Sequence, residues 1–475
     1  MKNFISAFKD GEKISWPLVA IFLIVNAIVL YNAIFHNPAV QYDSTGHLMN
    51  IRVIAMGRLP TPTESGEYFS APLAYLLPAG LISAAGLPLL QALKVAQLVD
   101  FLLSLILTFT LLKIADTLFP GRIAARLISL GMLALLPVYY RTFAYVRGEP
   151  FVACLTLVAV YLSIQIFARR RADWPRVITL GVILGIDILA RQWAFFFFPA
   201  LLAFVLLCAW AGETQFKAAL VRVVAIILLA ALLGGWFYVS LYQNYGTLTA
   251  FNRKPGEQNL GNQPVSFYTG LGLNNLFSKP VRPLLNNRLL PILYSDTWGD
   301  YWGYFLVYVI DSRSGSQVAG SNFENAISGH PPAWISTNYD SFGTYLGSVN
   351  AIAVVPSLIF LAGLLYGIWE LLRYLRPEGK RPPLDGSALL TLTAIFALAG
   401  YFWFLVTYPS ASSGSATVKA TYIIQVYPVL ALLVANLFEK LAFLRARQKW
   451  LWLLGLAFLY DFSAFITHFN VQPWK

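Results

Sequence analysis

The segment between residues 41 and 75 concentrates side chains that could perform acid–base chemistry. Asp43 and His47 are four residues apart, so on a helix they would lie on one face. A carboxylate can act as a general base, and the imidazole could orient that carboxylate or contact a phosphate. Alternatively, Asp43 is a solvated loop residue or a helix N-cap, and His47 is a half-buried structural residue. Three more side chains of this segment are candidates for substrate binding: Glu64, Glu67 and Tyr75.

The elements that must hold this segment are apolar. The chain has 475 residues, of which 58% are hydrophobic and 12% are charged. That charged fraction is about half of the usual value for soluble domains, and the mean hydropathy is +0.63. We therefore expect an integral membrane protein. The net charge of +12 is not accompanied by a basic arm or zinc-ligand spacing, so no nucleic-acid partner is expected.

Apolar runs of roughly 18 to 25 residues mark segments that could cross a bilayer. About eleven are present: 16–35, 95–113, 123–140, 150–168, 176–191, 193–210, 218–243, 349–373, 388–408, 421–439 and 449–468. Lys and Arg gather in the loops that should be cytoplasmic, which places the N-terminus inside and the C-terminus outside. The same pattern leaves the apolar run 72–90 at the outer surface, as a helix broken by proline and glycine. The predicted fold is all-α and polytopic.

Two outward-facing segments are long, and they divide the chain into regions. Residues 36–94 would form an outer catalytic loop with juxtamembrane helices. Residues 244–348, rich in Tyr, Trp, Asn, Gly and Pro, would form a large loop or lid on the membrane surface. The remaining regions are a cytoplasmic N-terminus with the first span (1–35), a transmembrane bundle (95–243) and C-terminal transmembrane helices (349–475).

Several charged side chains are predicted at the outer boundary of the membrane. Arg141 and Arg147 run against the positive-inside trend, and a guanidinium matches the geometry of a phosphate. They either hold an anionic partner or are snorkelling anchors. Lys419, in a later outward segment, is a further phosphate candidate. Asp187 and Arg191 lie four residues apart at the end of a predicted span, and we expect them to form a structural ion pair.

The most unusual part of the large loop is YSDTWGDYWGYF, residues 294–305. Asp296 and Asp300 flank Trp298, and carboxylates beside aromatic rings could bind sugar hydroxyls. A divalent cation between the two carboxylates is conceivable, although two ligands are weak evidence for one. The alternative is an interfacial aromatic belt in which the Asp residues cap helices.

The opening motifs YDSTGH, MGRLPTP and YFSAPLAYLL resemble the first loop of GT-C glycosyltransferases, a superfamily that includes protein O-mannosyltransferases and lipid A aminoarabinose transferases. Later segments resemble the family in the same order: ALKVAQLVDFLLSL, YYRTFAYVRGEPFVACLTL and VKATYIIQVYPVLALL. The chain has Lys94 and Thr421 where the family usually has Arg. Many relatives also have a second acid beside the catalytic Asp, whereas here Ser44 follows Asp43.

The resemblance implies an inverting glycosyltransferase of the cytoplasmic membrane, with a polyprenyl-phosphate sugar donor and chemistry on the outer face. Asp43 would be the general base. Donor phosphate would be held by Lys94, Arg141, Arg147 and Lys419. Substrate contacts would come from His47, Glu64, Glu67, Tyr75, Asp296, Trp298 and Asp300. No cofactor is certain, and a divalent cation is the one candidate.

A lipid or glycan acceptor is favoured over a protein, because the outer loops lack a peptide-binding signature. One rival class is a transporter or flippase of lipid-linked glycans, which would place ionisable residues near span centres and show pseudo-repeats. Another is a glycan polymerase or ligase, in which the acid of the first loop would matter less. A structural membrane scaffold would explain neither Asp43 nor the outward arginines.

Overall fold

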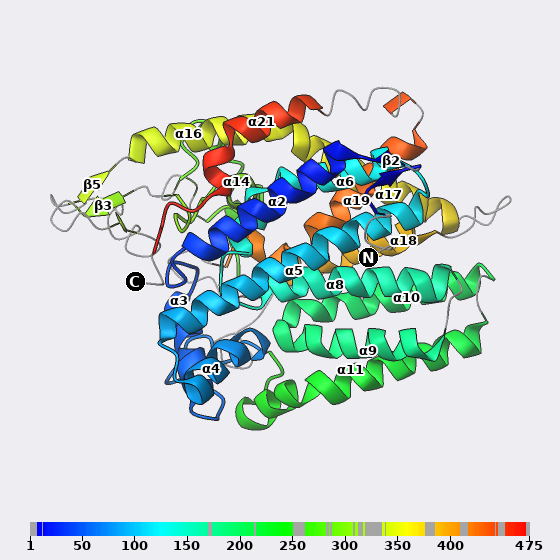
Figure 1. The fold of residues 1–475 in the computed structure, drawn as a ribbon, viewed down its shortest axis with the longest axis horizontal. Coiled ribbons are helices and arrows are strands. Elements are labelled where there is room, and N and C mark those ends of the chain that lie inside the picture. Colours follow the sequence, from blue (N-terminus) through cyan, green and yellow to red (C-terminus); the bar gives the residue numbers. More distant parts are fainter. Residues whose placement is uncertain are drawn as a thin grey trace.

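The protein is described by a computed structural model that covers residues 7–11, 13–169, 173–212, 215–249, 262–281, 285, 287–306, 309–311, 317–318, 335–337, 339–375, 385–408, 417–441, 443–444 and 452–471. These residues are mostly helical (Figure 1). The strands are short. β1 (Lys9–Asp10) pairs with β2 (Lys13–Ile14), and β3 (Val309–Asp311) lies between β4 (Gln317–Val318) and β5 (Ile335–Thr337), all antiparallel.

The longer helices form the bundle. They are α2 (Trp16–Phe35), α5 (Leu89–Leu118), α8 (Glu149–Ser163) with its π-helical continuation η1 (Ile164–Ala168), α9 (Trp174–Ala190), α10 (Phe197–Trp210) with the preceding 3-10 helix η2 (Gln192–Phe196), α11 (Phe216–Tyr245), α16 (Tyr339–Ile352), α17 (Val354–Leu375), α18 (Gly386–Thr407) and α19 (Val426–Lys440). The shorter helices are α3 (Ser44–Ala55), α4 (Leu73–Ala85), α6 (Ile123–Ala134), α7 (Pro137–Thr142), α12 (Val265–Thr269), α13 (Leu273–Leu276), α14 (Leu289–Trp298), η3 (Ala420–Ile423), α21 (Leu454–Tyr460) and η5 (Phe462–Phe465).

In the described part of the chain, 7 helices are long and apolar enough to cross a membrane. They are α2, α5, α8 with η1, η2 with α10, α11, α17 and α18. The polytopic helical fold is therefore confirmed, but the count of eleven spans is not. The predicted span 123–140 divides into α6 and α7 at Pro137, because proline lacks an N–H and favours the first turn of a new helix. In the predicted spans 176–191, 421–439 and 449–468, the described helices α9, α19 and α21 have 17, 15 and 7 residues and are not among those 7.

The run 72–90, predicted to be a broken interfacial helix, contains the 13-residue helix α4. Pro78 lies inside this helix, and Gly86 ends it in the left-handed conformation at φ +64°. A helix of this length is shorter than a bilayer core requires. The break before α5 therefore occurs where the sequence predicts it.

Glycines allow α9 and α11 to pack closely, as small residues do in membrane helices. A Cβ on Gly234 of α11 would lie 2.4 Å from Ile188 Cγ1 and 2.5 Å from the carbonyl oxygen of Gly185, both in α9. This contact fixes the end of α9, from which Arg191 extends.

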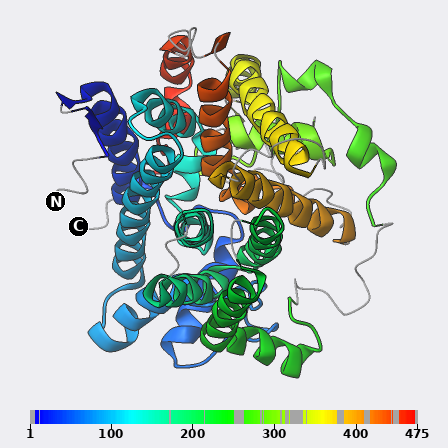
Figure 2. The same ribbon diagram turned by 90° about the vertical axis from the view of Figure 1, so that its right-hand side faces the viewer.

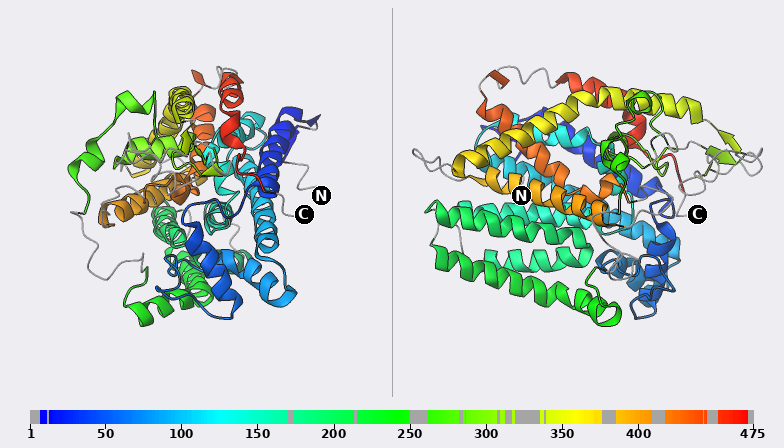
Figure 3. Two further views of the ribbon diagram at one scale, coloured as in Figure 1. Left: turned by 90° about the vertical axis from the view of Figure 1, so that its left-hand side faces the viewer. Right: turned by 180° about the vertical axis from the view of Figure 1, so that it is seen from behind.

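The segments predicted to face outward meet at one end of the bundle. In Figure 1, α3 and α4 lie at the left end, on the same side as β3 and β5, whereas β2 lies toward the right end. Figure 2 views the bundle nearly along its helices. Figure 3 shows α16 and α17 following one another along one side, with α21 beside them. The first loop and the large loop are thus brought together although they are far apart in sequence.

The last described residues bind to this same end. The backbone N–H of Asn37 donates to the carbonyl oxygen of Phe469 at 2.8 Å, and the N–H of Val471 donates to that of Phe35 at 2.9 Å. The N–H of His468 donates to the carbonyl oxygen of Phe305 at 2.9 Å. The C-terminal segment therefore joins the start of the first loop to the large loop.

Candidate active site

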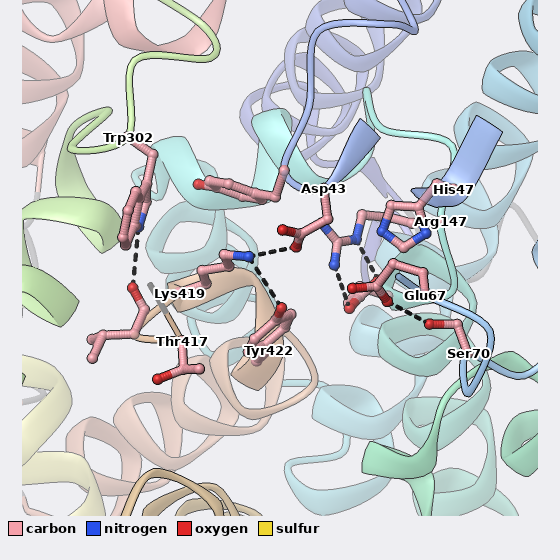
Figure 4. Close-up of polar contacts among 12 residues, drawn as sticks. Asp43, His47, Glu67, Ser70, Arg147, Trp302, Thr417, Lys419 and Tyr422 are labelled. Atoms are coloured by element: carbon pink, nitrogen blue, oxygen red, sulfur yellow. Dashed lines mark hydrogen bonds and ion pairs between the residues drawn. The ribbon is translucent and has the colours of Figure 1, made fainter. Parts of the chain in front are cut away.

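Six of the predicted site residues gather at one end of the bundle. They are Asp43, His47, Glu67, Tyr75, Arg147 and Lys419, and Figure 4 shows all of them except Tyr75, with Asp43 at the centre. They come from the first loop, from the turn before α8 and from the residue that precedes η3. No two of these segments are adjacent in sequence, so the fold itself creates the cluster.

Asp43 has an unusual backbone. It is the N-cap of α3 and adopts the left-handed conformation, with φ 54° and ψ 28°. L-residues rarely adopt this conformation, and Asp and Asn tolerate it best. Its side chain does not cap the helix. Instead, Asp43 Oδ2 accepts a hydrogen bond from Lys419 Nζ at 2.5 Å, and the Asp43 side chain remains 38% exposed. A strained, accessible carboxylate is typical of a functional position.

Lys419 lies between two aromatic rings. Its side chain is 8% exposed, and Nζ is 5.2 Å from the centre of the Tyr42 ring and 5.4 Å from that of Tyr422. Nζ also donates to the Tyr422 hydroxyl at 3.3 Å. An ammonium has three donors, so Asp43 and Tyr422 leave one for a ligand.

A buried ionic network lies beside Asp43. Arg147 donates through Nε to Glu149 Oε2 at 2.7 Å and through Nη2 to Oε1 at 3.1 Å. Arg191 Nε donates to Glu149 Oε1 at 3.1 Å, and Arg191 Nη1 lies 3.4 Å from Glu67 Oε2. Ser70 donates to Glu67 Oε2 at 2.6 Å. Arg147 Nη1 is buried and has no hydrogen-bond partner among the described residues.

His47 is fully buried. Its Nδ1 is 2.7 Å from the Tyr75 hydroxyl, and its Nε2 has no hydrogen-bond partner in the described chain. One ligand atom from each of Asp43, His47 and Glu67 lies within 4.8 Å of the other two. This set could hold a divalent cation, and the unpartnered Nε2 fits such a role. The Lys419 ammonium would compete for Asp43.

The electrostatics favour an ionised Asp43. Burial would raise the pKa of this carboxyl, but the positive charges of Lys419 and then Arg147 outweigh burial and hold the pKa below its ordinary value. Burial raises the pKa of Glu67 above its ordinary value, against the opposing charge of Arg191. Burial, followed by the charge of Arg147, keeps the pKa of His47 well below its ordinary value. At neutral pH the site therefore presents a carboxylate, which is the form that a general base requires, beside a neutral imidazole.

Gly148→Ala is expected to destabilise this network. A Cβ at this position would lie 2.0 Å from the carbonyl oxygen of Ala190, so the turn carrying Arg147 and Glu149 would have to move away from Arg191. Overpacking of this kind costs about 1–3 kcal/mol, and the melting temperature should fall. Gly131→Ala is the matched control, because its Cβ would meet nothing within 4 Å. Equal melting temperatures for the two variants would contradict the close approach.

Three predicted site residues instead form a buried clamp. Arg141 Nη2 is 2.8 Å from Asp296 Oδ1, and Arg141 Nη1 is 3.7 Å from Asp300 Oδ1. All three side chains are buried. Because these groups satisfy one another, the structure adds no support to the phosphate contact of Arg141 or to the sugar contacts of Asp296 and Asp300, which stay predictions. The Arg141 guanidinium also contacts both Asp296 and Asp300, the two carboxylates between which a divalent cation was considered.

Three more predicted site residues are buried or have other partners, and their predicted roles stay predictions. Trp298, predicted to bind substrate, is buried and packs with its ring 6.2 Å from that of Phe360. Lys94, predicted to bind phosphate, is buried and donates to the carbonyl oxygen of His36 at 2.5 Å. Glu64, predicted to bind substrate, pairs with Arg58 at 2.5 Å in an exposed turn.

Some residues of the cluster were missed by the sequence analysis. Arg191 was expected to pair with Asp187, but its guanidinium binds Glu149 and Glu67, while Asp187 accepts from Thr156 at 2.8 Å. The 3-10 helix η2 begins just after Arg191, so the α-helical spacing that suggested the pair ends there. Tyr42, Ser70 and Tyr422 lie within the motifs YDSTGH, YFSAPLAYLL and VKATYIIQVYPVLALL, but the sequence analysis gave them no role.

No protein-family model and no curated protein matches this sequence. Among solved structures, one match is ArnT from Cupriavidus metallidurans bound to undecaprenyl phosphate. Its TM-score is 0.49 and its sequence identity is 12%, and the match covers 93% of this chain and 63% of that chain. AglB, the oligosaccharyltransferase from Archaeoglobus fulgidus in complex with an inhibitory peptide and a dolichol-phosphate, matches with a TM-score of 0.49 and 15% identity.

The AglB match covers 95% of this chain and 56% of that chain, so this chain spans less than two thirds of either protein. These similarities concern the fold alone, and the function proposed below rests on the residues of the site.

Proposed function

We propose that the protein is an inverting glycosyltransferase of the cytoplasmic membrane, which moves a sugar from a polyprenyl-phosphate donor to a lipid or glycan acceptor on the outer face. One observation carries the proposal. The accessible carboxylate of Asp43 lies 2.5 Å from the Lys419 ammonium, with Arg147 beside them. A general base and phosphate-binding cations thus converge in one site among apolar helices.

The donor phosphate is assigned to Lys419 and Arg147. Lys419 has a donor left over, and Arg147 Nη1 has no partner in the described chain. The guanidinium of Arg147 lies 5.7 Å from the centre of the Tyr42 ring, and Lys419 Nζ lies 5.2 Å from the same centre. The two cations therefore both lie close to the ring of Tyr42. Preorganised cations of this kind stabilise charge that grows on a leaving phosphate.

The reaction balances without a nucleotide or a redox partner. The acceptor hydroxyl or amine transfers its proton to the Asp43 carboxylate, and its freed electron pair forms the bond to the anomeric carbon. The bond from that carbon to the phosphate oxygen breaks, and its electron pair stays on the lipid phosphate. Attack from the face opposite the phosphate inverts the anomeric carbon. A cation held by Asp43, His47 and Glu67 would add Lewis-acid stabilisation of the phosphate.

Undecaprenyl phosphate is expected to raise the melting temperature of the purified protein. A ligand that binds only the folded state stabilises it by about 2.7 kcal/mol at 100 times its Kd. Lys419→Met should reduce the shift. Lys440→Met is the matched control, since Lys440 pairs with Glu370 and Asp385 at the far end of α19. If the wild-type protein melts at the same temperature with and without the lipid, the donor assignment fails.

Lys419→Met should also move the pH dependence of transfer. Lys419 is the largest of the charges that lower the pKa of Asp43, so its removal lets that pKa rise. A general base works only above its pKa, and the acidic limb of the profile of kcat/KM against pH should therefore shift to higher pH. Lys440→Met should leave the limb in place. A limb unchanged in Lys419→Met would argue against Asp43 as the base.

A further inference from the structure

Asp296 connects the two segments that carry the reacting pair. Its side chain is fully buried near the C-terminal end of α14. Oδ1 accepts from the Tyr42 hydroxyl at 3.0 Å and from Arg141 Nη2 at 2.8 Å. Oδ2 accepts from the backbone N–H of Ala420 at 2.7 Å. Tyr42 immediately precedes Asp43, and Ala420 immediately follows Lys419.

Each contact constrains one member of the Asp43–Lys419 pair. The Tyr42 hydroxyl is held by Asp296, and the Tyr42 ring packs edge-on against Tyr145 at 5.5 Å and Tyr304 at 5.0 Å. This fixes the chain at the point where Asp43 enters the left-handed conformation. The bond to Ala420 holds the first residue of η3, which aims the Lys419 side chain back toward Asp43.

We propose that Asp296 is a positioning residue, which sets the distance and orientation of Asp43 and Lys419 by holding the residues next to both. The role of Asp296 in catalysis rests on the glycosyl transfer proposed above. Asp296 does not touch the donor or the acceptor. It acts through the hydroxyl of Tyr42 and the amide of Ala420, and it gives the large loop a direct role in the geometry of the first loop.

The simpler role for a buried carboxylate beside Arg141 is that of a counter-ion. Asp300 offers the comparison, because its Oδ1 is also within 3.7 Å of Arg141 and its Oδ2 accepts from the backbone N–H groups of Phe305 and Leu306, each at 2.7 Å. These bonds fix the large loop itself. Both carboxylates are buried beside the Arg141 guanidinium, but the hydrogen bonds of Asp296 run to the segments that carry Asp43 and Lys419.

Asp296→Asn tests the assignment. An amide keeps the volume but has only one accepting oxygen, so it cannot accept from Tyr42 and Arg141 on one side and from Ala420 on the other. Hydrogen exchange of the full-length protein, followed by mass spectrometry, should speed up in peptides from both segments, residues 38–47 and 417–424. Tyr42→Phe, which removes only the hydroxyl, should speed up exchange in residues 38–47 alone. Asp300→Asn should leave both segments as in the wild type.

Binding of undecaprenyl phosphate gives the functional readout. Asp296→Asn should weaken it by about tenfold, the effect of losing a hydrogen bond to a charged group, and Asp300→Asn should not. Unchanged exchange in both segments of Asp296→Asn would overturn the proposal, as would a uniform acceleration along the whole chain. If exchange follows the expected pattern but the wild type binds no undecaprenyl phosphate, Asp296 still positions the pair and the donor assignment alone fails.

Discussion

Asp43→Asn is expected to lower the rate of sugar transfer by about 10²- to 10⁴-fold, the contribution typical of a general base, while the protein stays folded. The amide cannot take a proton from the acceptor. The substitution should not disturb the backbone, because Asn tolerates the left-handed conformation that Asp43 adopts at φ 54°. The amide oxygen can also still accept from Lys419.

Three measurements on the purified protein isolate this effect. Release of undecaprenyl phosphate from its sugar conjugates reports turnover. The melting temperature should stay near that of the wild type. Binding of undecaprenyl phosphate should persist, because Lys419 and Arg147 are intact. Asp43→Ala is the comparison: it removes the same carboxylate but adds a backbone cost of about 1–2 kcal/mol in the left-handed region. A folded Asp43→Asn variant with wild-type turnover would refute the mechanism.

Glu149→Gln should be the most destabilising of the conservative changes near the site. Glu149 is fully buried and accepts from two arginines, at 2.7 Å and 3.1 Å from Arg147 and at 3.1 Å from Arg191. Removing one partner from a buried ionic network leaves uncompensated charge, at a cost of about 3–5 kcal/mol. The amide would also direct an N–H group at a guanidinium, where both groups are donors.

Glu64→Gln is the matched control for this prediction. It is the same chemical change, also at a carboxylate paired with an arginine, but the Arg58 and Glu64 side chains are 49% and 30% exposed in a surface turn, where ion pairs contribute little. The two variants should be compared by thermal melting in the same detergent. A melting temperature for Glu149→Gln as close to the wild type as that of Glu64→Gln would show that the arginines find other partners.

The sequence predicted the class of fold because its strongest signal, long apolar runs, depends on length and composition alone. It overestimated the spans where other effects break a run, as at Pro137, which starts α7. Hydropathy records that the segment is apolar but not that its helix is interrupted. The short antiparallel strands near residues 309 and 335 were not predicted either, because the large loop lacks the alternating pattern of a strand.

Asp43, Arg147 and Lys419 could be selected from the sequence because each is a polar residue beside long apolar runs, and the structure brings them together. The sequence could not indicate which partner each charged residue has. Arg141 and Arg147 look equivalent in sequence, yet Arg141 is neutralised by Asp296 and Asp300, from a segment about 155 residues away. Arg147 pairs with its neighbour Glu149 and keeps one nitrogen without a partner in the described chain. Only the tertiary structure separates the two.

The sequence separation of the Asp43–Lys419 pair, 376 residues, has a consequence for biosynthesis. Translation proceeds at about 5–20 residues per second, so Asp43 emerges from the ribosome roughly 20 to 75 seconds before Lys419. During that interval the left-handed turn and the ionic network of Arg147 can form, but the carboxylate lacks its counter-ion. A nascent chain should therefore insert most of its helices before it acquires a functional centre.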